Sequence, residues 1–227
     1  MNETINKPLS SGSLRIAAGW SSYVFHPLLF PAYGTFFLIL AHPHLFTGAG
    51  YKVPLLWNMV VFILTFVFPA VWLGMMKALG LIPDLYLRNK KERIIPYIAT
   101  ATFYLWTYRM FRPGVGNLLF QSQLISSMML GASVSISLAF IANIFMKVSL
   151  HSVGVGSFVG LLMSVMAYSE YDLRILLVLA LLLGGWVGSS RLLLAEHEQR
   201  EVYYGYLAGF AGQFVSFKII PTITNYF

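Results

Sequence analysis

The sequence predicts an all-α fold: a polytopic membrane helical bundle of about six to seven transmembrane helices, built as a single integral membrane domain over residues 1–227. Three observations predict it: hydrophobic residues make up 58% of the chain, charged residues make up 10%, and the mean hydropathy is +0.72. A soluble domain carries about a quarter charged residues, so this composition excludes a soluble globular protein. A length of 227 residues suits one compact bundle rather than two domains.

Charge and cysteine content narrow the classes of partner and site. The formal net charge is +7, which in a soluble protein would suggest a nucleic-acid partner. No aromatic-studded basic groove lies outside the apolar segments, so we expect no nucleic-acid partner and favour membrane lipids or a phosphorylated ligand. The chain has no cysteine, which excludes disulfides, zinc–thiolate sites, iron–sulfur clusters and cysteine nucleophiles.

Residues 1–20 form an N-terminal segment that differs from a signal peptide. No basic start is followed directly by an apolar stretch and a small-residue cleavage site. We expect the second half of this segment to lie along the membrane interface as a short amphipathic helix, with Trp20 as an anchor. The first apolar segment, 23–41, contains Pro27 and Pro31, so we expect a kinked helix there.

Seven apolar segments are candidate spans, since a transmembrane helix needs about 20 apolar residues. They cover residues 23–41, 55–79, 97–111, 119–146, 153–168, 173–189 and 203–220. The third segment is short, and the fourth is long enough to tilt in the bilayer.

Polar residues concentrate in three segments, 87–96, 147–152 and 190–201. Two apolar segments separate the first polar segment from the second, and two separate the second from the third. If all seven apolar segments cross the membrane, the three polar segments lie on one face and their ionisable residues can form one site. If 97–111 does not cross, the bundle has six spans and the polar segments do not share a face.

The basic residues leave the orientation open. A raw count by the positive-inside rule places the polar segments in the cytoplasm. When these segments and nearby Lys77 are set aside as ligand-binding, the basic residues that remain favour the opposite orientation. On the polar side these are Lys7 and Arg15, and on the other side Lys52, Arg109, Arg112, Arg174 and Lys218.

The segment 190–201 carries the strongest chemical pattern. His197 and Glu201 are four residues apart, so on a helix they share one face. A carboxylate on one ring nitrogen fixes the tautomer and leaves the other nitrogen free to attack or to transfer a proton. Arg191 would lie roughly 120° away from His197 on an unbroken helix, so both can face one ligand only if the helix ends or bends near 192–195. The alternative is a cluster of charged residues that flanks a helix end and snorkels into water.

The segment 147–160 combines helix caps with a histidine. Ser149 and Ser152 are both good N-caps for the following helix. His151 lies at the start of that helix, where free N–H groups and the helix dipole favour an anion. The spacing of Gly156 and Gly160 favours helix packing. A structural histidine at the membrane interface is the alternative role for His151.

The segment 87–96 contains four basic residues within positions 88–93. Lys90 and Arg93 are three residues apart and could share one helical face. Arg93 could clamp a phosphate in bidentate fashion, while Lys90 would act as a point charge. The alternative is ordinary charge at a membrane edge. Together the three segments supply cations and two histidines, which fits phosphoryl transfer through a histidine nucleophile.

This arrangement resembles the type 2 phosphatidic acid phosphatase superfamily, the membrane lipid phosphate phosphatases. The third part of the family signature, Ser-Arg-x5-His-x3-Asp, matches Ser190, Arg191 and His197, with Glu201 in place of aspartate. The second part, Pro-Ser-Gly-His, reads Val148-Ser149-Leu150-His151 and keeps the serine and the histidine.

The first signature part, Lys-x6-Arg-Pro, is the least complete. Arg93 is followed by Ile94 rather than proline, and Tyr86 stands where the family has lysine. Lys90 is the most plausible substitute on helical spacing, with Lys91 or Arg88 as alternatives. The resemblance covers residues 87–201, about half of the chain.

The resemblance implies a role for each matching residue. His197 is the nucleophile that forms a phosphohistidine, Glu201 orients it, and His151 is the general acid and then the base. No metal or other cofactor is needed. The residues that would bind the phosphate are Arg191, Arg93, Lys90, Ser149 and Ser190. The signature assigns nothing to His26, His42 and His44.

The expected function is therefore that of a membrane lipid phosphatase acting on a lipid phosphate or pyrophosphate. Candidate substrates are a polyprenyl pyrophosphate, phosphatidic acid, phosphatidylglycerol phosphate and a phosphorylated glycolipid. We expect a bacterial inner-membrane protein whose site faces the periplasm. The alternatives are a lipid phosphotransferase with the same chemistry and a non-catalytic headgroup binder or flippase, and the oligomeric state is left open.

Overall fold

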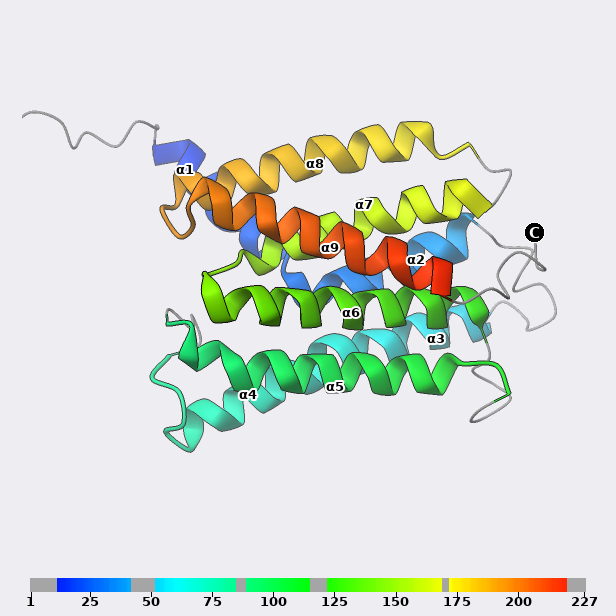
Figure 1. Ribbon diagram of the computed structural model, residues 1–227, viewed down its shortest axis with the longest axis horizontal. Helices are drawn as coiled ribbons and strands as arrows, with labels where there is room; N and C mark the ends of the chain where they lie inside the picture. The colour runs from blue at the N-terminus through cyan, green and yellow to red at the C-terminus, as the bar shows by residue number, and fades with distance from the viewer. Residues whose placement is uncertain (1–11, 42–51, 85–88, 115–121, 169–171, 220–227) are drawn as a thin grey trace, which may run out of the picture.

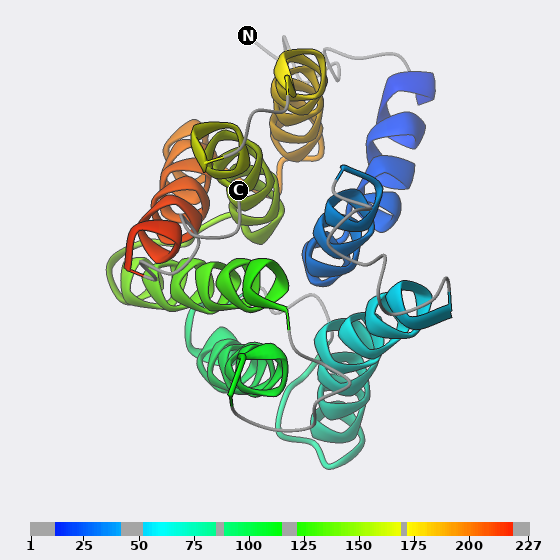
Figure 2. The same cartoon turned by 90° about the vertical axis from the view of Figure 1, so that its right-hand side faces the viewer.

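The computed structural model describes residues 12–41, 52–84, 89–114, 122–168 and 172–219. Every regular element in these ranges is helical, which confirms the all-α prediction. The long helices run side by side along the long axis of the molecule (Figure 1). In the end-on view, α7 (Leu150–Tyr168) lies near the middle of the arrangement and contacts α2 (Phe30–Ala41), α6 (Gln123–Phe145), α8 (Arg174–Leu193) and α9 (Gln199–Ile219) (Figure 2).

The first predicted span is divided into separate helices. Helix α1 covers Gly12–Val24, a 3-10 turn covers Pro27–Leu29, and α2 follows. His26 has extended backbone angles (φ −62°, ψ 133°) and Pro27 starts the turn, so the predicted kink is confirmed at the first of the two prolines. The expected amphipathic helix before Trp20 is part of α1, and the Trp20 side chain is 69% exposed.

The second predicted span is one rod with an irregular middle. Helix α3 (Lys52–Phe62) passes through a π-helical turn (Ile63–Val67) into α4 (Phe68–Ala78). A π-helical turn widens the helix locally and is often found at functional sites. Helix α5 (Ile94–Phe111) follows a short 3-10 turn, Lys91–Arg93.

Five helical segments are long and apolar enough to cross a membrane, which makes the chain a membrane protein. They are Gly12–Leu40, Lys52–Ala78, Gln123–Phe145, Leu150–Ala167 and Arg174–Leu193. Helices α5 and α9 fall outside this group, although α5 packs on α6 and α9 packs on α6 and α7. The count of six to seven spans therefore stays a prediction.

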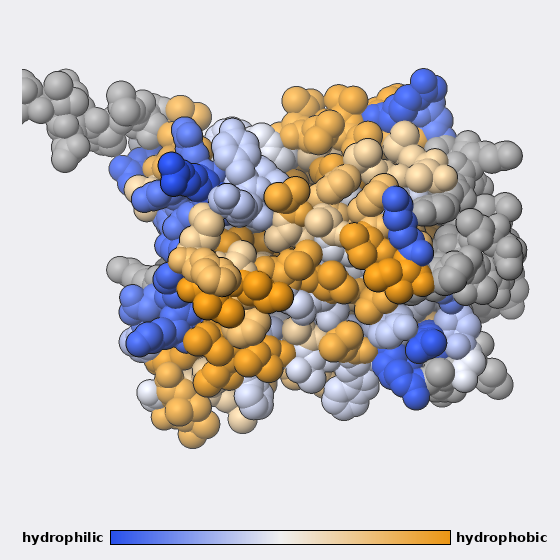
Figure 3. Space-filling view, in the orientation of Figure 1, coloured by the Kyte–Doolittle hydropathy of each residue, from blue (hydrophilic) through white to orange (hydrophobic). Residues whose placement is uncertain are grey.

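On the face in Figure 3, hydrophilic residues gather toward the two ends and hydrophobic residues cover the middle.

Helices α7 and α9 meet backbone to backbone along what we call the α7–α9 seam. A Cβ atom on Gly205 would collide with the Ser149 carbonyl, and one on Gly209 would collide with the Val153 carbonyl. Gly156 on α7 lies equally close to the backbone of α9, which confirms the predicted packing role of that glycine. The seam therefore holds the first turns of α7 and α9 beside each other.

The three polar segments meet at one end of the bundle, which is the arrangement expected if all seven apolar segments cross the membrane. The Lys147 ammonium donates to the Glu196 carbonyl at 2.7 Å. The Arg93 guanidinium donates to the Val148 carbonyl at 3.1 Å. In Figure 1 the start of α5, the start of α7 and the α8–α9 connection lie together at the left.

Candidate functional site

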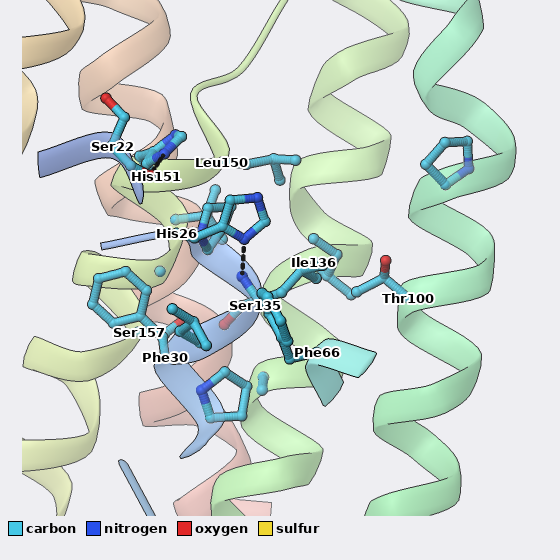
Figure 4. A pocket seen from close by; sticks show the side chains of 18 of the residues that line it. Ser22, His26, Phe30, Phe66, Thr100, Ser135, Ile136, Leu150, His151 and Ser157 are labelled. Atoms are coloured by element: carbon cyan, nitrogen blue, oxygen red, sulfur yellow. Dashed lines mark hydrogen bonds between the residues drawn. The ribbon is translucent and has the colours of Figure 1, made fainter. Parts of the chain in front are cut away.

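A cavity of about 970 Å³ extends from the polar end into the interior of the bundle. Its polar lining includes Arg93, Arg191, His151 and His197. Farther along, the lining comes mainly from apolar side chains, with the hydroxyls of Thr100, Ser135 and Ser157 among them (Figure 4). Apolar residues of this deeper part include Phe66, Met128, Ile136, Phe158 and Leu161.

His197 and Glu201 form the pair that their spacing predicts. His197 lies in the connection just before α9, and Glu201 lies in the first turn of α9. The His197 Nδ1 and a Glu201 carboxylate oxygen are 2.6 Å apart, and the two side chains are 6% and 15% exposed. Because a carboxylate only accepts hydrogen bonds, Nδ1 carries the proton and Nε2 is the free nitrogen.

The His197 ring is neutral at neutral pH. Burial, followed by the nearby cations Lys147, Arg93 and Arg191, lowers its pKa to about 3. The Glu201 carboxylate acts in the opposite direction, because it stabilises the protonated ring. A neutral imidazole with an unprotonated Nε2 is the nucleophilic form of histidine.

His151 lies in the first turn of α7, where the predicted cap is present. The Ser149 hydroxyl accepts from the Ser152 amide at 3.4 Å and is the N-cap, whereas Ser152 lies inside the first turn. Nε2 of His151 contacts the Ser22 carbonyl at 3.2 Å. The His151 ring meets the His26 ring edge to face, with centroids 6.1 Å apart (Figure 4).

Arg191 reaches the cavity because α8 ends where the sequence requires. Helix α8 stops at Leu193, and Ala195 adopts a left-handed conformation with φ 54°. The Glu196 amide bonds back to the Arg191 carbonyl at 3.2 Å, a Schellman-type ending that normally uses glycine. This break confirms the predicted bend near 192–195 and brings Arg191 and His197 to the same cavity.

Arg191 is 3% exposed, and its guanidinium is held by two partners. Nη1 donates to the Glu196 carboxylate at 2.8 Å, and Nη2 donates to the Ser22 hydroxyl. Arg93 is also buried and lines the same cavity. Two buried guanidiniums can bind a phosphate in bidentate fashion.

Three of the predicted phosphate ligands do not line the cavity. Lys90 donates to the Phe145 carbonyl at 3.0 Å, because a lysine near a helix C-terminus satisfies its last carbonyls. The Ser149 hydroxyl is used as the cap of α7. The Ser190 hydroxyl donates to Trp186 at 2.8 Å and accepts from Ser21 at 3.1 Å, so it joins α8 to α1.

The structure places neither alternative for the first signature lysine, Lys91 or Arg88, at the cavity. Lys91 is exposed and is not among the residues that line the cavity, and Arg88 lies outside the described residues, as do His42 and His44. Lys77, in the last turn of α4, lines the cavity instead. The sequence contained a sign of this, because Lys77 is the last of four residues whose spacing places them on one face of a helix. The four are Phe66, Ala70, Leu73 and Lys77, all of which line the cavity.

Sequence reasoning missed Ser22 and His26, which line the cavity from the N-terminal segment. Neither residue belongs to a polar cluster in the sequence, so no local pattern marked them. Within the ranges that the structure describes, no three His, Asp or Glu side chains gather as metal ligands would.

No family model, curated protein or solved structure matches the chain. The resemblance to the lipid phosphate phosphatases stays a prediction that depends on the signature residues.

Proposed function

We propose that this protein is a membrane lipid phosphatase that hydrolyses a lipid phosphate or pyrophosphate through a phosphohistidine on His197. One observation carries the proposal: a single cavity joins a polar end with two buried guanidiniums and two histidines to an apolar interior. The polar end suits a phosphate, and the apolar interior suits a hydrocarbon tail. A phosphorylated amphiphile is the ligand class that needs both.

The reaction has two steps. Nε2 of His197 attacks phosphorus, the P–N bond forms, and the P–O bond to the leaving group breaks. His151, protonated at both ring nitrogens in the substrate complex, gives its Nδ1 proton to the leaving oxygen. A water molecule then attacks phosphorus, the P–N bond breaks, and His151 accepts the proton of that water. Arg93 and Arg191 stabilise the charge on the equatorial oxygens in both steps.

The proposed substrates are a polyprenyl pyrophosphate, phosphatidic acid, phosphatidylglycerol phosphate or a phosphorylated glycolipid. We propose that the site faces the periplasm of a bacterial inner membrane, which the basic residues outside the polar segments favour. No step of this mechanism uses a metal.

Phosphate release by purified protein in detergent, with a metal chelator present, tests the proposal. Wild type and His197→Ala are compared on a panel of lipid phosphates and pyrophosphates. Release by wild type that disappears in His197→Ala is the expected result, and the preferred lipid identifies the substrate. Absence of release from every lipid, with lipid binding intact in both proteins, would overturn the proposal.

A non-catalytic headgroup binder or flippase is the second candidate. The departures from the first two signature parts favour it, because a binder needs the cations of the cavity but no complete catalytic signature. His197→Ala separates the two functions: a binder keeps its function in this variant, whereas an enzyme does not. Added lipid or sugar acceptors distinguish a phosphotransferase, which would give a phosphorylated acceptor instead of free phosphate.

A further inference from the structure

The N-terminal segment contributes to the site a residue that belongs to none of the sequence motifs. Ser22 lies in the last turn of α1 and lines the cavity. Its hydroxyl contacts Arg191, and its carbonyl contacts His151. Ser22 thereby connects two side chains of the proposed site, Arg191 from α8 and His151 from α7. Figure 4 shows Ser22 beside His151.

The hydroxyl of Ser22 is oriented to accept from Arg191. Its proton is directed to the Ala18 carbonyl, to which it donates at 2.9 Å. A hydroxyl has one proton and two acceptor lone pairs, so its oxygen is left to accept from Nη2 of Arg191. Since Nη1 of the same guanidinium is bonded to Glu196, Arg191 is fixed from two sides.

The carbonyl of Ser22 is available because α1 ends two residues later, at Val24. Carbonyls in the last turn of a helix have no partner within the helix. Nε2 of His151, 3.2 Å away, provides one. A carbonyl oxygen only accepts, so Nε2 carries a proton. Nδ1 of His151 is therefore the ring nitrogen left to exchange a proton with a ligand.

We propose that Ser22 is a positioning residue of the phosphate site. Its hydroxyl orients Arg191, its carbonyl fixes the tautomer of His151, and α1 is therefore a part of the site and not only a membrane scaffold. The kinetic consequences rest on the proposed function, whereas the consequence for anion binding rests on geometry alone.

The neighbouring serine provides a matched control. The Ser21 hydroxyl has one proton for two acceptors, the Ala18 carbonyl at 2.8 Å and the Ser190 hydroxyl at 3.1 Å. It therefore holds α1 against α8 but contacts neither Arg191 nor His151. Ser21→Ala removes a hydroxyl from the same turn but removes no hydrogen bond to Arg191 or His151.

The first experiment compares Ser22→Ala, Ser21→Ala and Ser22→Thr in lipid phosphate hydrolysis. Loss of a hydrogen bond to a charged group should raise KM about tenfold in Ser22→Ala, with little change in kcat. Ser21→Ala should keep the wild-type KM, and Ser22→Thr should restore it by returning the hydroxyl. A KM for Ser22→Ala equal to that for Ser21→Ala would overturn the proposal.

A double-mutant cycle tests whether Ser22 acts through Arg191. Residues that form one contact give non-additive effects. Once Arg191→Gln has removed the guanidinium, adding Ser22→Ala should change KM by less than about twofold. If the two effects multiply, Ser22 does not act by orienting Arg191.

Binding of a non-hydrolysable alkyl phosphonate separates this inference from the proposed function. If wild type releases no phosphate, the phosphatase proposal fails, but the affinity for the phosphonate still decides the role of Ser22. Ser22→Ala should bind about tenfold more weakly than Ser21→Ala or wild type. Equal affinities in the three proteins would refute the role of Ser22, whether or not wild type is an enzyme.

Discussion

The two histidines of the cavity are held by different partners. Nδ1 of His197 donates to the Glu201 carboxylate at 2.6 Å, whereas Nε2 of His151 donates to the Ser22 carbonyl at 3.2 Å. A carboxylate carries a full charge and stabilises an imidazole that becomes positive during attack. A backbone carbonyl provides only a dipole. The difference supports His197 as the nucleophile and His151 as the group that transfers a proton.

The comparison also concerns which ring nitrogen is free. In His197 the free nitrogen is Nε2, and in His151 it is Nδ1, because each partner oxygen only accepts. The ring nitrogens that lack these partners are thus opposite in the two residues, although both residues line one cavity. Each prediction below changes one side of this pair and leaves the other intact.

Changing the leaving group should separate the two histidines most strongly. A general acid matters less when the leaving group is already acidic, as in an aryl phosphate. We expect His151→Ala to lose about 10²–10⁴-fold in kcat on an alkyl lipid phosphate and much less on p-nitrophenyl phosphate. His197→Ala should lose about 10⁴-fold or more on both substrates. Steady-state kinetics measures this, and equal losses for both variants on both substrates would contradict the assigned roles.

Replacing the Glu201 carboxylate with an amide should give His197 the tautomer that cannot attack phosphorus. In Glu201→Gln the amide can donate to Nδ1, which moves the ring proton to Nε2 and blocks attack. We expect kcat to fall by about 10²–10⁴-fold, with KM little changed. Glu201→Asp keeps an acceptor and should retain more activity than Glu201→Gln. If Gln and Asp variants are equally active, Glu201 does not set the tautomer.

The pH dependence of stability should report the buried His197. Its pKa in the folded protein is about 3, against about 6.5 in an unfolded chain. Between these values the unfolded state binds a proton that the folded state does not, so the free energy of unfolding falls as the pH falls from 6.5 toward 3. The slope is at most about 1.4 kcal/mol per pH unit.

Denaturant unfolding of wild type and His197→Asn at pH 7 and pH 5 measures this effect. The variant should lose less stability than wild type over that interval, because it lacks the titrating ring. Parallel losses in the two proteins would show that His197 is not the group whose protonation is suppressed.

The smallest expected effect concerns the turn that carries His197. Ala195 has φ 54°, a left-handed conformation that costs a residue with a Cβ about 1–2 kcal/mol. Ala195→Gly should therefore stabilise the protein by up to about 1 kcal/mol without affecting His151. The same substitution at Ala180, inside α8, should destabilise by at least about 0.5 kcal/mol. Thermal unfolding compares the two, and destabilisation by Ala195→Gly would contradict the expectation.

Local patterns predicted one half of the site better than the other. The spacing of His197 and Glu201, the break after Leu193 and the cap at Ser149 are decided by residues near in sequence, so periodicity and capping rules reach them. The choice of cations depends on how distant helices pack. Lys90 has suitable spacing from Arg93 but is drawn to the end of α6.

Packing also explains what sequence reasoning missed. Lys77 reaches the cavity because the helix face that carries Phe66, Ala70, Leu73 and Lys77 packs toward the interior of the bundle. Ser22 and His26 belong to a segment that the sequence presents as an interfacial helix and a proline-kinked span. Nothing local shows that α1 lies against α8, and this contact brings Ser22 to Arg191.

The α7–α9 seam has a consequence for how the site responds to its lipid surroundings. His151 is at the start of α7 and Glu201 is at the start of α9, and glycines let the two backbones touch between them. At these glycines few side-chain atoms lie between the two backbones, so little can rearrange to let one helix slide along the other. A thinner or thicker bilayer is accommodated by helix tilt, and the seam makes these two helices tilt as one body. We therefore expect the distance between His151 and Glu201 to change little with bilayer thickness.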